Sequence, residues 1–226
     1  MDASKKVKKV TLNLSTAEDV LNYSVCEITS IDNFEGDKPK FGGLFDPRMG
    51  TIDKSIICST CKQTSKFCAG HFGRIVLAKP VYYPQHINTI IKILQMICYH
   101  CHRLMDPKLD KLLDLKLKTK TGILRFENIY QKCNKKKVCS HCHIVQSKFK
   151  RENLKLIRTC DNQTEVIFPS KILEIFENLD HRFSALIGVP KLAGLVCSIL
   201  PVAPPCIRPS VYTGNMRSED DMSFKL

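Results

Sequence analysis

The chain has 226 residues, of which 43% are hydrophobic and 25% are charged, and these fractions are typical of a folded globular protein. Its net charge of +13 favours partners that carry negative charge, phosphate groups among them. No run of about 18 apolar residues occurs, and the lysine-containing start MDASKKVKKVTLNL lacks the apolar segment of a signal peptide, so we expect neither a membrane span nor a secreted protein.

The hydrophobic pattern predicts short strands and helices that alternate along the chain. In the first half we expect a strand over 7–14, a helix over 15–24, a strand over 26–29, a loop over 32–51, a strand over 73–83 and a helix over 86–104. The last of these carries an apolar stripe of Ile87, Ile90, Ile91, Leu94 and Ile97, which is most simply core.

The second half continues in the same way. We expect a charged helix over 106–122, a basic loop over 134–143, a strand or hairpin over 150–168, a helix over 169–180, an apolar run ending extended over 196–211, and a helix over 217–226. Ser170 and Ser218 are the expected N-caps of the two helices. The fold class is therefore α+β, with an N-terminal strand–helix unit and loop (1–52), a zinc-binding segment with a basic loop (53–168), and a helix with a proline-rich stretch (169–226).

Twelve cysteines occur, and many stand in close pairs beside histidines. Secreted disulfide frameworks are also rich in cysteine, but they are usually short and follow a signal peptide. Paired cysteines with histidine neighbours are instead typical of zinc sites in a reducing compartment. We therefore expect an intracellular zinc protein. The isolated cysteines are more simply small buried hydrophobes: Cys26, Cys160, Cys197 and Cys206.

The strongest motif is CSTCKQTSKFCAGHFG, residues 58–73. Its donors Cys58, Cys61, Cys68 and His71 have the spacing C-x2-C-x6-C-x2-H, so two tight turns can direct four ligands at one ion. Three thiolates and one imidazole suit tetrahedral zinc. Because all four positions would be filled by protein, the site is expected to be structural and not catalytic.

A second motif combines two C-x2-C pairs, Cys98 with Cys101 and Cys139 with Cys142. One zinc ion shared by both pairs would join the ends of the long segment between them. Five neighbouring residues offer alternative donors, and the ligand set stays open at this point: His100, His102, Cys133, His141 and His143.

The excess of positive charge is concentrated between 108 and 158, where 15 basic residues face 4 acidic ones. Lys135, Lys136 and Lys137 lie in this stretch and are candidate nucleic-acid contacts, although a solvated surface is an equally ordinary explanation. The chain lacks the H-x-E signature of a zinc deaminase, a phosphate-binding G-x-x-x-x-G-K-[ST] loop and a G-x-S-x-G elbow, so no catalytic residue is assigned.

Several stretches together resemble one family. KKVTLNLSTAEDVLNYSVCEIT, FGGLFDPRMGTID with the C-x2-C-x6-C-AGHFG motif, IVLAKPVYYPQHI and LPVAPPCIRPSV with RSEDDMSFKL occur in the order found in the amino-terminal part of the largest subunit of multisubunit DNA-directed RNA polymerases of the eukaryotic and archaeal kind. The resemblance extends over nearly the whole chain, and the first cysteine motif with its flanks is its most specific part.

The resemblance implies a fold and a function. The fold would be the clamp-head lobe, and the chain would close over DNA template and RNA–DNA hybrid with two structural zinc ions, one held by each cysteine group. Arg208 lies in the proline-rich approach to the cleft and is a candidate nucleic-acid neighbour, with a salt bridge inside the protein as the alternative. Expected partners are the second-largest subunit, other polymerase subunits and a chain carrying the rest of the largest subunit.

The chain departs from the family in length. It lacks the N-A-D-F-D-G-D triad that holds Mg²⁺, so this chain alone is expected to be inactive and Mg²⁺ is expected only in the complete nucleotidyltransferase. Because Leu226 falls inside a predicted helix, a fragment or a split subunit is expected. A divergent eukaryote (nucleus) and a large DNA virus (cytoplasmic factory or virion) both stay open as origins.

Two other functions stay open beside the polymerase clamp. One is a free-standing zinc-containing protein that binds nucleic acid or acts as a regulator with a clamp-like fold. The other is a zinc hydrolase or deaminase, which would need a metal site with an open position for water.

Overall fold

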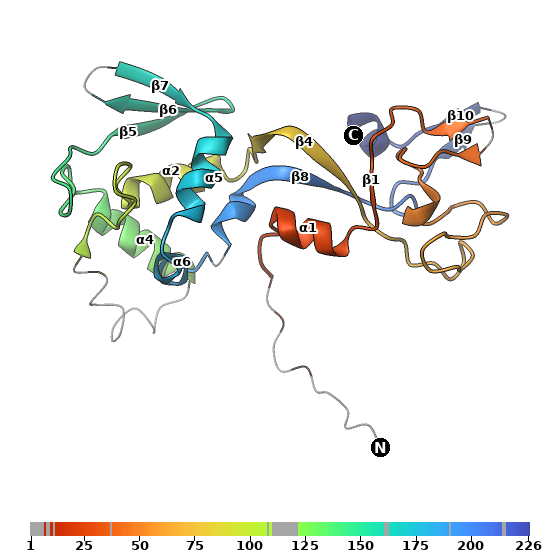
Figure 1. The fold of residues 1–226 in the computed structure, drawn as a ribbon, viewed down its shortest axis with the longest axis horizontal. Helices are drawn as coiled ribbons and strands as arrows, with labels where there is room; N and C mark the ends of the chain where they lie inside the picture. Colours follow the sequence, from red (N-terminus) through yellow and green to blue (C-terminus); the bar gives the residue numbers. More distant parts are fainter. Residues whose placement is uncertain are drawn as a thin grey trace. The chain divides into compact units, whose positions relative to one another are not determined.

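The structure, a computed structural model, describes Val7, Val10, Leu109 and the ranges 12–36, 38–107, 122–160, 163–189, 191–213 and 216–226. These residues form a mixed α+β fold with small sheets, as the sequence predicts (Figure 1). Among the described residues, no helix is both long and apolar enough to cross a bilayer. The helices are α1 (Ala17–Tyr23), α2 (Ile87–Met96), α4 (Gly122–Cys133), α5 (Pro169–Glu177), α6 (His181–Ile187) and α7 (Asp221–Lys225), with 3₁₀ turns η1 (Pro47–Met49) and η2 (Leu192–Leu195).

Four small sheets are described. Their strands are β1 (Cys26–Glu27), β2 (Phe34–Glu35), β3 (Lys38–Pro39), β4 (Gly73–Tyr82), β5 (Lys148–Glu152), β6 (Lys155–Cys160), β7 (Gln163–Ile167), β8 (Val196–Val202), β9 (Val211–Thr213) and β10 (Met216–Ser218). Two sheets have three strands, in the orders β1-β4-β8 and β5-β6-β7, and β2-β3 and β9-β10 are two-stranded. The segment expected as a strand or hairpin over 150–168 is the antiparallel meander β5-β6-β7.

The chain divides into two compact units that are interleaved in sequence. Unit 1 contains the described residues of Met1–Thr16 and Val81–Val196, and unit 2 contains those of Ala17–Pro80 and Cys197–Leu226. The first cysteine motif lies in unit 2 and the second lies in unit 1. The three contiguous segments expected from the sequence, with boundaries after residues 52 and 168, stay a prediction.

The core of unit 1 is built around α2. Of the predicted apolar stripe, Ile87, Ile90, Leu94 and Ile97 are fully buried and Ile91 is partly buried, and Ile93 is fully buried as well. Their neighbours in the same core come from α4, β5, β6, α5 and α6. The predicted helix over 86–104 ends early, at Met96, because the chain becomes extended at Ile97 and turns into the first C-x2-C pair of the second motif.

Several predicted boundaries were wrong for local reasons. Pro169 occupies the first turn of α5, where its missing N–H costs nothing, so Phe168 and not Ser170 is the N-cap. At α7 the side chain of Asp220, not Ser218, accepts a hydrogen bond from the N–H of Met222.

Two further predictions for unit 1, the strand over 7–14 and the helix over 106–122, have different outcomes. The described residues within 7–14 form no strand, which contradicts the expected strand there. Most of the charged helix expected over 106–122 lies outside the described residues. Helix α4, which follows it, was not predicted.

The central position of Ile93 leads to a stability prediction. We expect Ile93→Ala to lower the free energy of unfolding by about 2–5 kcal/mol, because it removes a buried side chain and leaves a cavity. The matched control is Ile123→Ala at the start of α4, where the side chain is 86% exposed and the loss is expected to stay within about 0.5 kcal/mol. Urea denaturation of both variants measures the difference, and equal midpoints would contradict this description of the core.

Candidate metal centres

Unit 2 brings the four donors of the first motif together. The ligand atoms of Cys58, Cys61, Cys68 and His71 all lie within 4.8 Å of one another. The Sγ atom of Cys68 is 3.7 Å from Nε2 of His71. Four donors at these separations have the composition and spacing of a zinc site with three cysteines and one histidine.

The pair Cys58 and Cys61 sits in a tight backbone turn. The N–H of Cys58 donates to the carbonyl of Gln63 at 2.9 Å, and the N–H of Lys62 donates to the carbonyl of Cys58 at 3.0 Å. Closing this turn requires Lys62 to adopt a φ of 58°, a left-handed conformation that is uncommon outside glycine. We call this turn, with its two hydrogen bonds and its left-handed residue, a knuckle.

The second half of the first motif depends on glycine. Gly70 has a φ of 83°, and a Cβ atom there would lie 2.7 Å from Sγ of Cys206 and 2.8 Å from Cβ of Pro204. The proline-rich stretch therefore packs directly against the loop that carries Cys68 and His71. The N–H of His71 donates to the carbonyl of Met49 at 2.9 Å, which fixes the backbone at this ligand.

A short loop from Asp46 to Met49 supports both halves. The buried carboxylate of Asp46 binds the guanidinium of Arg48, with 2.6 Å between Oδ2 and the terminal nitrogen. Burial opposes ionisation of Asp46, but hydrogen bonds from Arg48 prevail and hold its pKa below the usual value. In the same loop the carbonyl of Arg48 accepts from the hydroxyl of Thr60 at 2.6 Å. In the sequence analysis the DPRMG stretch, residues 46–50, serves only as part of the family resemblance. Its role in positioning the ligands depends on contacts that the sequence alone does not reveal.

Unit 1 brings the two pairs of the second motif together. The Sγ atoms of Cys98 and Cys142 are 3.5 Å apart, and those of Cys101 and Cys139 are 3.7 Å apart. A tetrahedron with zinc–sulfur bonds of about 2.3 Å has edges of about 3.8 Å, whereas disulfide-bonded sulfurs are about 2.0 Å apart. The separations therefore match a shared metal ion and not disulfides.

Both pairs of the second motif form the same knuckle as the first pair. The N–H of each leading cysteine donates to the carbonyl five residues later, at 2.8 Å for Cys98 and 2.9 Å for Cys139. The residue after each pair is left-handed, with φ of 55° at His102 and 58° at His143. The three C-x2-C pairs thus share one local geometry.

The alternative donors do not join these groups. Within the described part of the chain, the two four-residue groups are the places where three or more donors converge, and His100, His102, His141 and His143 belong to neither. Cys133 is fully buried in the core of unit 1. Burial, followed by the negative charge of Asp106, raises the pKa of Cys133 to about 12, which suits an inert core thiol.

The thiols within each group differ in acidity. Burial opposes ionisation of Cys139, but N–H groups of Cys142 and His141 bring its pKa down to about 7. Burial raises the pKa of Cys98 to about 12 and that of Cys68 to about 11. A divalent metal ion would stabilise all of these sulfurs as thiolates, so the donor sets suit zinc.

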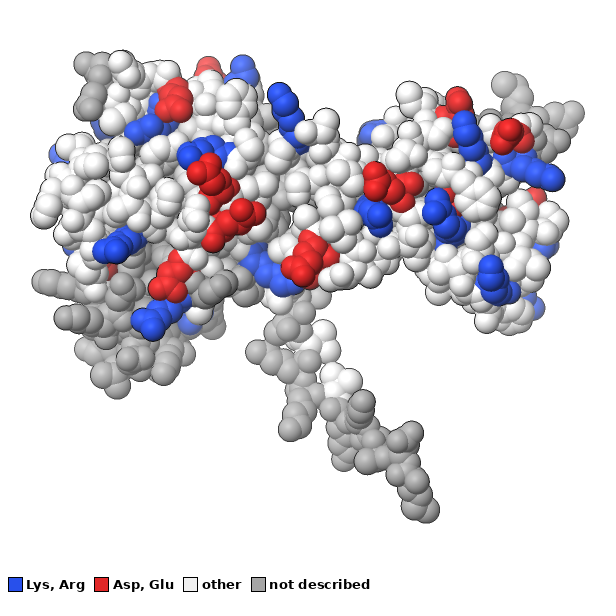
Figure 2. Space-filling model, in the orientation of Figure 1, with Lys and Arg blue, Asp and Glu red and all other residues white. Residues whose placement is uncertain are grey.

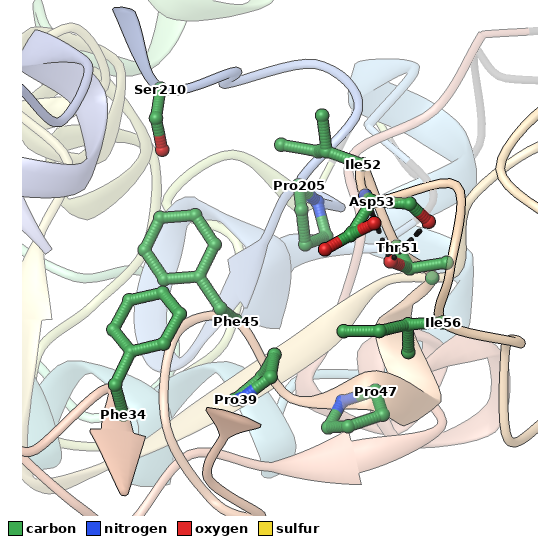
Figure 3. A pocket seen from close by; sticks show the side chains of 11 residues that line it. Phe34, Pro39, Phe45, Pro47, Thr51, Ile52, Asp53, Ile56, Pro205 and Ser210 are labelled. Atoms are coloured by element: carbon green, nitrogen blue, oxygen red, sulfur yellow. Dashed lines mark hydrogen bonds between the residues drawn. The ribbon is translucent and has the colours of Figure 1, made fainter. Parts of the chain in front are cut away.

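A cavity of about 370 Å³ lies in unit 2 (Figure 3). Its walls combine apolar side chains such as Phe34 and Phe45 with the polar residues Thr51, Asp53 and Ser210. Hydrogen bonds from the N–H and hydroxyl of Ser55 hold the pKa of Asp53 low, so its carboxyl group is not suited to act as a general acid.

The basic candidates have contrasting surroundings. Lys135 and Lys137 are exposed, whereas Lys136 is partly buried and lies 3.0 Å from a carboxylate oxygen of Asp106. On the face drawn in Figure 2, basic and acidic side chains are mixed among the described residues and do not form one continuous basic patch. Lys135 and Lys137 stay candidates for phosphate contacts.

Arg208 is fully buried. Its guanidinium donates to the carbonyls of Ala203 and Leu44 and to the hydroxyl of Ser223, and it lies 5.1 Å from the centroid of the Phe45 ring. This geometry supports the alternative of a role inside the protein, with hydrogen bonds in place of the expected salt bridge. It gives no support to the expected nucleic-acid contact, since the guanidinium has no exposed surface.

Comparison with known proteins gives a consistent result. A family model described as RNA polymerase Rpb1, domain 1, matches residues 4–226. The chain is 34% identical to DNA-directed RNA polymerase subunit Rpo1N of Methanocaldococcus jannaschii, a match that covers 98% of this chain and 18% of the relative. It is 32% identical to DNA-directed RNA polymerase II subunit RPB1 of Euplotoides octocarinatus, a match that covers 97% of this chain and 51% of the relative.

A third relative, subunit Rpo1N of Methanothermobacter thermautotrophicus, is 34% identical, with 98% of this chain and 26% of the relative covered. The chain therefore spans between 18% and 51% of the length of these curated relatives.

The two donor groups predict two zinc ions for each chain. We expect Cys61→Ser and Cys101→Ser each to reduce the zinc content by one ion, because each removes one thiolate from a group of four. The same substitution at Cys206 or Cys160, which lie outside both groups, should leave the zinc content unchanged. Metal analysis after gel filtration measures the ratio, and equal zinc in all four variants would contradict the assignment.

Arg208 allows a second prediction. We expect Arg208→Ala to lower the free energy of unfolding by about 3 kcal/mol or more, because buried carbonyl groups lose their donor. Lys225→Ala at the exposed end of α7 is the control and should change stability by less than about 0.5 kcal/mol. Denaturation curves test this, and a stable variant with weaker DNA binding would instead favour the nucleic-acid role.

Proposed function

The chain belongs to the family described as RNA polymerase Rpb1, domain 1, and from this premise we propose that it forms a clamp that closes on DNA template and RNA–DNA hybrid during transcription. It corresponds to the N-terminal region of the largest polymerase subunit. The observation that carries the proposal is the match over residues 4–226 together with two converged four-donor groups within that range. The clamp-head lobe is the fold that we assign to it.

Two structural zinc ions would shape this clamp. Each group offers four protein donors, so tetrahedral zinc would have no open position for an activated water. A zinc hydrolase or deaminase is therefore not favoured. The role of the metal would be to hold three knuckles and the loops between them in one arrangement, since a structural ion couples its binding to folding.

Catalysis would come from residues outside these 226. The chain has no N-A-D-F-D-G-D triad, so we propose that Mg²⁺ is bound by another polypeptide segment of the complete nucleotidyltransferase and that this chain alone is inactive. Its partners would be the second-largest subunit, the other polymerase subunits and the polypeptide that carries the triad. The net charge of +13 supports contact with phosphate backbones that does not depend on base sequence.

Two measurements test the proposal. The tagged chain, expressed in its native source, is expected to co-purify with a second-largest polymerase subunit and with the triad-bearing polypeptide. The zinc-loaded chain by itself is expected to bind duplex DNA weakly. If about four phosphates are contacted, its affinity should fall about 10²-fold between 50 and 200 mM salt.

The outcomes separate the clamp from a free-standing regulator. Salt-sensitive DNA binding without polymerase subunits in the purified complex would favour a free-standing zinc protein with a clamp-like fold. Co-purification without DNA binding by the isolated chain would support the subunit assignment and contradict the direct nucleic-acid contact.

A further inference from the structure

A cavity of about 420 Å³ lies in unit 1 beside the second metal group. Three segments form its walls. The knuckle of Cys98 and Cys101 supplies His102 and Arg103, and the knuckle of Cys139 and Cys142 supplies His141. The start of α6 supplies Asp180, which is its N-cap, and Arg182 in its first turn. The volume is within the range of small-ligand sites.

The polar lining of this cavity is mainly basic. Arg103 and Arg182 are both exposed, and within the described residues neither guanidinium has a hydrogen-bond or ion-pair partner. Asp180 is the one carboxylate of the lining, and its Oδ1 atom accepts a hydrogen bond from the backbone N–H of Arg182 at 2.9 Å. The cavity therefore has two permanent positive charges with unused donors and one carboxylate that is already engaged.

We propose that this cavity binds a phosphate group, with the guanidinium groups of Arg103 and Arg182 as its principal donors. A guanidinium offers parallel N–H donors that match two oxygens of one phosphate, so a pair of unengaged arginines around a cavity favours this ligand. The phosphate comes either from a nucleic-acid backbone, which rests on the proposed clamp function, or from free phosphate-containing small molecules. Neither arginine had been singled out from the sequence, because the two are far apart along the chain.

The metal and the phosphate site are coupled by geometry. His102 and Arg103 follow one cysteine pair directly and His141 lies within the other, so the four converging thiols hold these two walls together. Loss of the metal would release the two knuckles from each other and open the cavity. Phosphate binding therefore requires an intact second metal group, and removal of the first group in unit 2 leaves it in place.

The experiment compares arginine variants of the full zinc-loaded chain. Arg103→Ala and Arg182→Ala are each expected to weaken binding of a 20-base-pair DNA duplex about five- to tenfold at low salt and to reduce the slope of log K against log salt by about 1. Charge-conserving Arg103→Lys and Arg182→Lys are expected to lose part of the affinity, because lysine lacks the planar fork. Lys79→Ala, an exposed residue on β4 outside the cavity, removes the same charge and is expected to change affinity less than twofold.

Two further arms identify the source of the phosphate. Inorganic pyrophosphate is added as a competitor, and zinc analysis with thermal unfolding shows that each variant is folded. Loss of DNA affinity in the arginine variants supports backbone recognition. Unchanged DNA affinity with loss of pyrophosphate binding supports a site for free phosphate compounds. If both arginine variants bind both probes as tightly as the wild type, or if Lys79→Ala loses as much affinity, phosphate binding in the cavity is contradicted, while DNA binding by the clamp is not.

If the wild-type chain binds pyrophosphate through these arginines but binds no DNA, the proposed DNA contact of the clamp is contradicted, while phosphate binding in the cavity is supported.

Discussion

The convergence of four thiol or imidazole donors in each unit is the constraint on which the rest of the structure depends. The turns around these donors have little regular structure of their own, and the first motif lies in a region where strands β1, β2 and β3 are only two residues long. A tetrahedral ion bound to such a group would replace the extensive packing that these loops lack, because one metal fixes four side chains and the backbone between them. The sheet and helix framework then orients the outer surfaces of the knuckles.

Around the first group, residues outside the donor set hold the backbone of the ligands in place. The loop of Asp46, Arg48 and Met49 turns its carbonyl groups towards the motif, and the ion pair between Asp46 and Arg48 keeps that loop closed. Gly70 allows the proline-rich stretch to approach the ligands from the other side. Ligand residues alone would not produce this arrangement, since outer residues determine how a ligand is directed at its metal.

Local patterns in the sequence predicted some features well and others poorly. The spacing of Cys58, Cys61, Cys68 and His71 and the 3.6-residue periodicity of α2 are local, and the structure brings both sets of side chains together as expected. Positions that depend on distant contacts were not predictable in this way. Arg208 donates to Leu44, which is 164 positions away in the sequence, and to Ala203 and Ser223. The N-caps of α5 and α7 were missed for a local reason, because Pro169 and Asp220 decide where these helices begin. For the second group the sequence analysis and the family resemblance already pointed to the four cysteines with the nearby histidines as alternatives, and the fold brings the four cysteines together.

The left-handed residues after the three cysteine pairs have a consequence for how such sites are recognised among divergent chains. Lys62, His102 and His143 occupy a position where glycine would be conformationally easiest, yet all three keep the same turn. A search pattern that demands glycine there would overlook every pair in this chain. What the three pairs share is the two cysteines and the backbone turn, so a search pattern should leave the residue after the second cysteine unrestricted.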